Sequence, residues 1–198
     1  LTRMKKRIYS TNKFSATFNN FLDFEKISIN GKEFFNVIPL INLIEKDAEL
    51  ISMLTPKYIS KVHGDLHFDN ILINNYNEND PNFIFIDPRG LEQTYNYSYD
   101  IGKIFHSIHG MYDIIHEGLF DLNTEHKNNS FEATISLKNY PIIYFYQELH
   151  LNYLNFLMKT KFLENDKYWL VRSLFAQTSH FCSVMPFHLK NNKDEKLA

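Results

Sequence analysis

Two short stretches of the chain carry side chains that suit one kind of chemistry. In the first stretch Asp65 precedes Asn70 by five residues, and His67 lies between them; in the second, Asp87 ends an apolar run that starts at Phe83. A carboxylate can accept a proton from a hydroxyl group, and amide and carboxylate oxygens are the hard ligands that Mg²⁺ takes. These residue types therefore predict a magnesium-dependent site that acts on a hydroxyl group.

Transfer of a phosphoryl group needs these parts and few others. The protein mainly positions the attacking hydroxyl group and stabilises the charge on the phosphates. Asp65 suits the role of proton acceptor, and Asn70 and Asp87 suit the role of Mg²⁺ ligands. His67, two residues after Asp65, could donate a hydrogen bond to the transferred group. The interpretation that follows is phosphoryl transfer to a hydroxyl group.

A predicted β-hairpin connects the two stretches. Residues 70–74 and 82–87 are mostly apolar and predict two short strands, whereas residues 75–81 are polar and predict a loop. Antiparallel pairing of such strands brings their outer ends together. We therefore expect Asn70 and Asp87 to lie near one another, with Asp65 on the adjoining loop.

Longer motifs around these residues resemble a known family. They read His-Gly-Asp-Leu-His-x-x-Asn-Ile-Leu at 63–72, Ile-Asp-Pro-Arg-Gly at 86–90 and Tyr-Asp-Ile-Gly-Lys-Ile at 99–104. Together they resemble the aminoglycoside phosphotransferase and choline kinase family of small-molecule kinases, which has a protein-kinase-like fold. The Asp-Pro-Arg-Gly ending resembles members linked to bacterial sugar or capsular polysaccharide biosynthesis. The resemblance is specific from residue 62 to about residue 110.

This resemblance implies roles for particular residues. Asp65 would be the catalytic base, and Asn70 and Asp87 would hold Mg²⁺ and, through it, ATP or another nucleoside triphosphate. His63 and Asp100 would support the loop, with Asp100 hydrogen-bonded to the loop around His63 and Asp65. The acceptor would be the hydroxyl group of a small molecule, a sugar or a sugar-like compound. One departure is Pro-Arg-Gly after the second aspartate, where protein kinases have Phe-Gly.

Other chemistries fit the sequence less well. His63 and His67 are four residues apart, like the two ligands of a zinc protease helix, but that motif has a glutamate directly after the first histidine, and here Gly64 follows. The chain also lacks the Gly-x-Ser-x-Gly motif of serine hydrolases and the glycine-rich loop of P-loop enzymes. Zinc, serine-hydrolase and P-loop chemistry are therefore disfavoured.

The composition is that of a globular protein. Of 198 residues, 44% are hydrophobic and 16% aromatic, and the net charge of −2 gives no reason to expect a nucleic-acid partner. The one cysteine, Cys182, excludes an internal disulfide and suits a reducing cytoplasm. No apolar run approaches the roughly 20 residues of a membrane helix, and the basic start lacks the apolar stretch of a signal peptide. The expectation is a cytoplasmic protein without a membrane span.

The remaining patterns predict an α+β fold that is mainly helical. Asn30-Gly31 predicts the tip of another hairpin, residues 123–130 a polar break, and residues 131–137 a short strand or linker. A helical face of aromatic residues is expected from the spacing of Phe14, Phe18, Phe21 and Phe24. A helix is predicted over 39–54, with Leu40 and Leu43 on its apolar side. A second helix is predicted after Asp100, which would be its N-cap. Two more are predicted over 141–162 and over 168–184, the last ending before Pro186.

A complete protein-kinase-like enzyme has further parts that this sequence does not display. These are a glycine-rich loop over the phosphates and a lysine on an N-terminal strand, and neither is recognisable before His63. We therefore expect residues 1–198 to form a kinase-like C-terminal lobe, with 62–90 as its catalytic loop and metal-binding hairpin, and the N-terminal nucleotide lobe to be missing or reduced. Two functions stay open: a small-molecule kinase, or a kinase-like binding module or truncated pseudokinase that transfers nothing.

Overall fold

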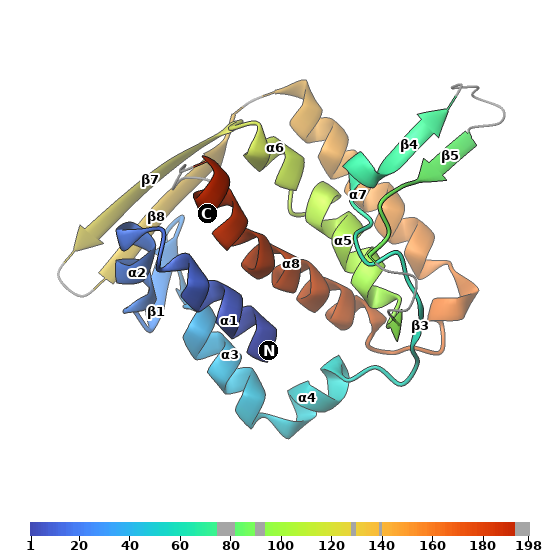
Figure 1. The fold of residues 1–198 in the computed structure, drawn as a ribbon, viewed down its shortest axis with the longest axis horizontal. Coiled ribbons are helices and arrows are strands. Elements are labelled where there is room, and N and C mark those ends of the chain that lie inside the picture. The colour runs from blue at the N-terminus through green and yellow to red at the C-terminus, as the bar shows by residue number, and fades with distance from the viewer. Residues whose placement is uncertain (75–81, 90–93, 128–129, 139, 193–198) are drawn as a thin grey trace. The chain divides into compact units, whose positions relative to one another are not determined.

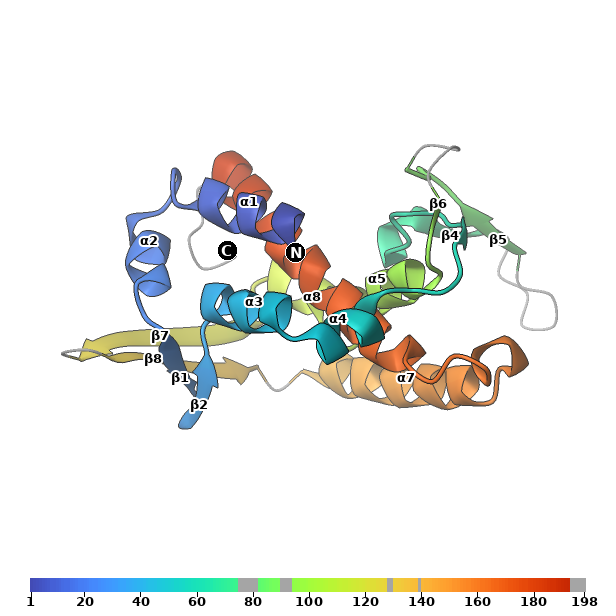
Figure 2. The same cartoon turned by 90° about the horizontal axis from the view of Figure 1, so that it is seen from below.

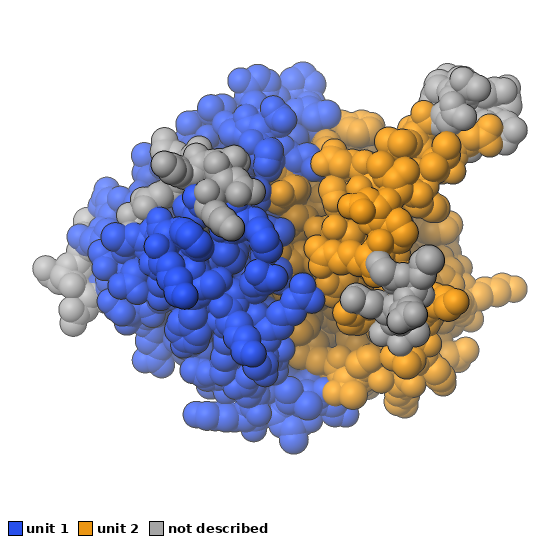
Figure 3. All heavy atoms as spheres, in the orientation of Figure 1, with its two compact units in different colours: residues 1–52, 113–143, 181–198 blue, residues 53–112, 144–180 orange. Residues whose placement is uncertain are grey.

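A computed structural model describes residues 1–74, 82–89, 94–127, 130–138 and 140–192 (Figure 1). The chain forms two compact units, each assembled from separate segments (Figure 3). Unit 1 comprises residues 1–52, 113–143 and 181–198, and unit 2 comprises residues 53–112 and 144–180. The fold class is α+β, as predicted, and the loop and hairpin that carry the candidate site belong to unit 2.

Unit 1 contains a mixed four-stranded sheet in the order β2-β1-β8-β7 (Figures 1 and 2). The strands are β1 (Lys26–Ile29), β2 (Lys32–Phe35), β7 (Phe120–Lys127) and β8 (Ser130–Leu137). The central pair β1 and β8 is parallel, and the two outer pairs are antiparallel. Its helices include α1 (Thr2–Thr11), α2 (Ala16–Leu22) and α3 (Val37–Lys46), and α6 (Tyr112–His116) lies mostly within it.

The hairpin predicted around Asn30-Gly31 is confirmed. Strands β1 and β2 pair with Ile29 opposite Lys32, which leaves Asn30 and Gly31 as a two-residue turn. Both have positive φ, 49° and 74°, as the tight turns that match strand twist require. The Asn30 side chain also donates to the carbonyl oxygen of Ile135 at 2.9 Å and accepts from its amide at 2.8 Å. These two bonds attach the turn to β8.

The prediction of a polar break at 123–130 is wrong for 123–127 and for Ser130, while residues 128 and 129 lie outside the described residues. Residues up to Lys127 belong to β7, which pairs with all eight residues of β8. Strand β7 lies at the edge of the sheet, where polar side chains on exposed positions are common. A polar edge strand loses the alternation by which strands are recognised, so β7 gave no local signal, whereas β8 matches the strand or linker predicted at 131–137.

The predicted aromatic helix face is also wrong. Ser15 begins a new helix, because its side chain accepts a hydrogen bond from the amide of Phe18 at 3.0 Å. Phe14 lies outside that helix and is 45% exposed. Phe21 of α2 packs instead against Phe131 of the sheet, with ring centroids 5.1 Å apart. Phe21 and Phe24 thus contribute to the core of unit 1, but not from one helix.

The predicted helix over 39–54 is two helices, α3 and α4 (Ala48–Leu54). Asp47 interrupts it because its carboxylate caps the second helix, accepting from the amides of Glu49 and Leu50 at 2.9 and 3.0 Å. The buried side was also predicted wrongly, since Ile41 is 2% exposed while Leu40 is 43% exposed.

Unit 2 is built around α5 (Ser98–Ile108), which packs against α7 (Pro141–Met158) and α8 (Trp169–Asn192). Its core is apolar and consists of Ile101, Phe105, Ile108, Leu157 and Leu163. Two strand pairs complete it: β3 (Ser60–Lys61) with β6 (Thr94–Tyr95), and β4 (Ile71–Asn74) with β5 (Asn82–Phe85). Short 3₁₀ turns lie at Phe68–Asn70 and Lys161–Leu163.

Three helix ends differ from the prediction. Tyr97, not Asp100, is the N-cap of α5, and Asp100 lies in the first turn. Helix α7 ends at Met158, and α8 continues through Pro186 to Asn192. A proline inside a helix removes one backbone hydrogen bond, which a long packed helix can tolerate. None of the helices in the described part of the chain is long and apolar enough to cross a membrane.

Gly102 allows α5 and α8 to approach closely. A Cβ atom at this position would lie 2.5 Å from Cβ of Ala176, 2.7 Å from the carbonyl oxygen of Ser173 and 2.9 Å from the amide of Gln177. Two of these three atoms are backbone and cannot rotate away. We therefore expect Gly102→Ala to lower the free energy of unfolding by about 1–3 kcal/mol, the usual cost of overpacking, although alanine favours helix by about 1 kcal/mol.

Denaturant unfolding of the two proteins measures this difference. The double variant Gly102→Ala/Ala176→Gly is the matched control, because it removes the Cβ overlap but leaves the two backbone contacts. This double variant should recover only part of the free energy of unfolding that Gly102→Ala loses. A Gly102→Ala protein more stable than the parent would contradict the close approach.

Candidate active site

The hairpin predicted between the two stretches is confirmed. Strands β4 and β5 pair from Ile71 opposite Phe85 to Asn74 opposite Asn82, and project from the helices of unit 2 (Figure 1). The amide of Ile86 then donates to the carbonyl oxygen of Asn70 at 3.1 Å. This bond extends the ladder by one step, so Asp87 follows directly after the residue that pairs with Asn70.

Asn70 is buried and joins the hairpin to the loop that carries Asp65. Its amide nitrogen Nδ2 donates to the carbonyl oxygen of Asp65 at 2.8 Å. The amide of His67 donates to the same oxygen at 2.9 Å, which gives the loop a tight turn. Nδ2 is used in this bond, so the oxygen Oδ1 is the atom of the Asn70 side chain that could bind a cation.

His63 ties the loop to the segment after β5. The amide of Asp65 donates to Nδ1 of His63 at 3.3 Å, and Nε2 lies 2.8 Å from the carbonyl oxygen of Ile86. An amide can only donate and a carbonyl oxygen can only accept, so the imidazole carries its proton on Nε2. In addition, the amide of Arg89 donates to the carbonyl oxygen of His63 at 2.8 Å. Loop and hairpin are thus linked by both the side chain and the backbone of His63.

Asp100 holds the same loop from the side of α5. Its carboxylate accepts from the amide of His63 at 2.7 Å and from the amide of Gly64 at 2.8 Å. Hydrogen bonds from backbone amides to a carboxylate are among the stronger ones in proteins. Gly64 has a φ of 80°, a conformation that glycine adopts without strain. The first turn of α5 therefore fixes the entry to the loop.

Asp65 contacts two cations. Its Oδ1 lies 3.2 Å from Nζ of Lys103 on α5, and its Oδ2 lies 3.4 Å from Nε of Arg89. Partial burial acts to raise the pKa of Asp65, but the charges of Lys103 and Arg89 outweigh it, and the pKa lies below its usual value. The carboxylate is therefore ionised at neutral pH, as a proton acceptor must be.

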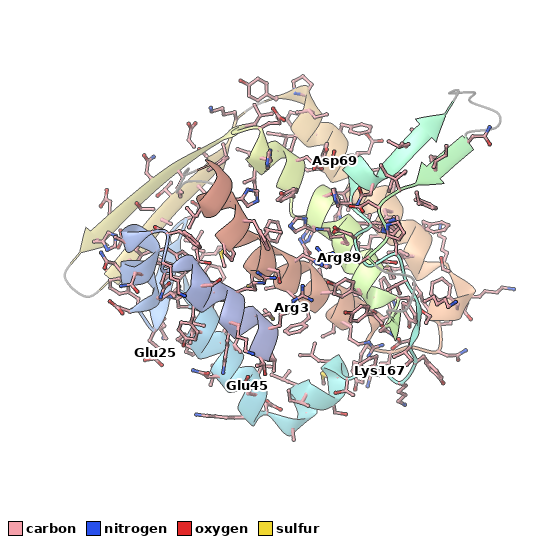
Figure 4. All side chains as sticks on the ribbon, in the orientation of Figure 1. Arg3, Glu25, Glu45, Asp69, Arg89 and Lys167 are labelled. Atoms are coloured by element: carbon pink, nitrogen blue, oxygen red, sulfur yellow. The ribbon has the colours of Figure 1, made fainter. Side chains whose placement is uncertain are left out.

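His67 follows in the loop and precedes the 3₁₀ turn Phe68–Asn70. Its Nδ1 lies 3.7 Å from Oδ2 of Asp69, whose side chain is 81% exposed (Figure 4). The amide of Asn70 donates to the carbonyl oxygen of His67 at 3.0 Å. The backbone of His67 thus shapes the turn, and its ring faces the acidic side chain that follows.

Asp87 is exposed and has a φ of 55°, in the left-handed region. Outside glycine this conformation is most tolerated by Asn and Asp, and it is enriched at functional sites. No group of three or more His, Cys, Asp or Glu side chains among the described residues could hold a metal by itself. The oxygens of Asn70 and Asp87 do fit Mg²⁺, which usually binds one or two carboxylates and completes its shell with phosphate and water.

Two residues of this cluster, Lys103 and Arg89, were not assigned a role from the sequence. Lys103 lies between Gly102 and Ile104 in the middle of α5, and its side chain is only 7% exposed. A lysine within an apolar helical stretch is a signal that could have identified it, because buried lysines are nearly always paired. Arg89 stood inside the Asp-Pro-Arg-Gly motif, but nothing in the sequence placed it beside Asp65.

A hollow of about 800 Å³ lies elsewhere, in unit 1 beside the tip of the β1–β2 hairpin. Its polar lining includes Lys26 and Glu33, which pair with one another at 2.6 Å. It contains none of the residues that the sequence assigned to chemistry. We therefore place the candidate site at the loop and hairpin of unit 2.

His180 of α8 is a buried neutral neighbour of the site. It is 4% exposed, Nε2 lies 3.3 Å from the carbonyl oxygen of Tyr99, and its ring meets the Tyr99 ring edge-on at 4.5 Å. Burial lowers the pKa of His180 to about 3, with further lowering by Lys103 and Arg89 and opposing effects from the Tyr99 carbonyl and Asp65. The imidazole therefore stays uncharged in the folded chain at neutral and mildly acidic pH.

This depressed pKa predicts acid sensitivity. Between pH 6.5, where histidine titrates in the unfolded chain, and pH 3, the unfolded state binds a proton that the folded state does not. The contribution of His180 to the free energy of unfolding should be fully present above pH 6.5. Below that pH it should fall by about 1.4 kcal/mol per pH unit. His180→Gln should flatten the fall between pH 6 and about pH 4.5, measured by denaturant unfolding. The exposed His126→Gln is the matched control, and an equal slope in both variants would contradict the assignment.

No protein-family model, curated protein or solved structure matches this chain. The function proposed below therefore depends on the residues of the site and on the resemblance of its motifs.

Proposed function

We propose that the chain carries the catalytic loop and metal-binding hairpin of a small-molecule kinase with a protein-kinase-like fold. The observation that carries the proposal is the network of hydrogen bonds around Asp65: Asn70 binds its carbonyl oxygen, and His63 binds both its amide and the strand that leads to Asp87. Three residues predicted to act together are thus connected through the loop backbone. If these residues resembled the family motif in spacing only by accident, nothing would require hydrogen bonds to link them in this way.

In this proposal each residue has a separate task. The acceptor oxygen forms a bond to the γ-phosphorus of ATP, the bond from that phosphorus to the bridging oxygen breaks, and ADP leaves with the electron pair. Asp65 orients the attacking hydroxyl group and takes its proton. Asn70 and Asp87 would hold Mg²⁺, which when bound neutralises charge on the phosphates. His67 donates a hydrogen bond towards the transferred group, and Asp100 keeps the loop in place through the amides of His63 and Gly64.

The ion pairs of Asp65 bear on how this step proceeds. Two neighbouring cations make the carboxylate a weaker base, so early removal of the proton is disfavoured. Phosphoryl transfer through a loose transition state needs little early deprotonation, because the hydroxyl proton becomes acidic only as the new bond forms. Asp65 then orients the hydroxyl group first and takes its proton late in the step. The motif resemblance supports a sugar or sugar-like acceptor and a cytoplasmic enzyme.

The same ion pairs favour a second candidate. A carboxylate held by Lys103 and Arg89 could also serve as a fixed structural link in a kinase-like binding module that transfers nothing. Release of ADP separates the two functions. The purified chain is incubated with ATP, Mg²⁺ and a panel of sugars, aminoglycosides and choline, and phosphorylated acceptor is measured. Acceptor-dependent ADP release that EDTA abolishes supports the kinase, whereas ATP or acceptor binding without release supports the binding module.

A further inference from the structure

Arg89 is fixed along its length except at its end. Its amide donates to the carbonyl oxygen of His63 at 2.8 Å, and its Cβ packs so closely on Gly64 that a Cβ there would lie 3.1 Å away. The guanidinium contacts Asp65 through Nε at 3.4 Å, and the side chain is 43% exposed (Figure 4). Within the described part of the chain Arg89 forms no other ion pair, so the two terminal nitrogens, which form the fork of the guanidinium, have no carboxylate partner there.

The charge of Arg89 is not needed to neutralise Asp65. Lys103, whose side chain is 7% exposed, already pairs with the other carboxylate oxygen at 3.2 Å. Two cations therefore face one carboxylate. Asp100, the neighbouring carboxylate on α5, directs its oxygens to the amides of His63 and Gly64. Of the two cations only Arg89 is well exposed, so its guanidinium is the one that a ligand can reach.

We infer that the acceptor is itself an anion: a hydroxyl compound of sugar size that carries a carboxylate or a phosphate, bound by the fork of Arg89 while its hydroxyl group faces Asp65. The planar guanidinium matches both groups through two parallel hydrogen bonds. A neutral acceptor would not form this pair of charge-assisted hydrogen bonds. This inference rests on the proposed function, and it narrows the acceptor class to sugar acids and sugar phosphates.

Matched acceptor pairs test the inference. The pairs are glucose with glucuronate and glucose 6-phosphate, galactose with galacturonate, ribose with ribose 5-phosphate, and glycerol with glycerate. The anionic member of the best pair should have the higher kcat/KM. Arg89→Gln should lower kcat/KM for that anion by about 10- to 100-fold, mainly through KM, and should leave the neutral member almost unchanged. Arg89→Lys keeps the charge but not the fork, so its loss should be intermediate.

Lys159→Gln is the control, because it removes one exposed positive charge from unit 2 outside the cluster. It should not alter the preference. A best acceptor that is neutral or cationic overturns the inference while leaving the kinase proposal intact. An equal loss for anionic and neutral acceptors, or a rise in KM for ATP alone, also overturns it, because Arg89 would then act on the nucleotide phosphates.

Binding measurements keep the inference testable if no acceptor is phosphorylated. That result would refute the kinase proposal for this chain but not the anion site. Titration calorimetry with the same sugar acids and sugar phosphates should then show binding to the parent chain that weakens in Arg89→Gln and not in Lys159→Gln. Equal binding by parent and Arg89→Gln, or no binding to either, would overturn the anion site.

Discussion

Replacing Asp65 with asparagine is expected to lower kcat by about 10²- to 10⁴-fold, equivalent to about 3–5 kcal/mol of transition-state stabilisation. The amide keeps the size of the side chain but cannot take the hydroxyl proton. The KM for ATP should change far less, because the proposed Mg²⁺ ligands are Asn70 and Asp87. Steady-state kinetics with the best acceptor measures both parameters.

The ion pair with Lys103 requires a control on stability. Asparagine removes the carboxylate that pairs with the buried ammonium, and breaking a buried pair on one side costs about 3–5 kcal/mol when no other group compensates. The double variant Asp65→Asn/Lys103→Met removes the ammonium as well and should regain stability without regaining turnover. A stable, folded Asp65→Asn protein with near-normal kcat would refute the role of Asp65.

The sequence predicted those parts of the site that depend on local geometry. Asn70 and the strand before Asp87 come together because two apolar strands that are close in sequence pair antiparallel. The loop itself is closed by bonds between near neighbours, such as Asn70 to Asp65. Asp100 was expected at this loop from the resemblance alone, since no rule of spacing relates it to residues 37 positions earlier.

Other parts depend on how distant elements pack, and no local pattern reports that. Lys103 reaches Asp65 only because α5 crosses beside the loop, a geometry set partly by the close contact of Gly102 with α8. The four-stranded sheet of unit 1 likewise depends on β1 pairing with β8, about 100 residues away along the chain. The prediction of an α+β fold that is mainly helical is confirmed, whereas the four-stranded sheet of unit 1 was not predicted and the kinase-like fold remains a proposal.

Replacing Asp87 is expected to remove the Mg²⁺ dependence of nucleotide binding. The carboxylate is exposed at the end of the hairpin, where a hydrated cation and phosphates can reach it. Loss of a residue that merely supports a metal ligand costs about 10- to 100-fold in metal affinity, so loss of a ligand should cost at least this much. Asp87→Ala should show it, but alanine is strained at a φ of 55° and would also destabilise the segment.

Asp87→Asn and Asp87→Gly separate these two effects. Both residues tolerate the left-handed conformation, so their unfolding free energies should stay within about 1 kcal/mol of the parent value. Neither supplies a carboxylate. Fluorescence titration with a labelled ATP analogue, with Mg²⁺ and with EDTA, measures the metal-dependent part of the affinity. That part should vanish in Asp87→Gly and weaken strongly in Asp87→Asn; if Asp87→Gly retained it in full, Mg²⁺ would be bound elsewhere and Asp87 would not be its ligand.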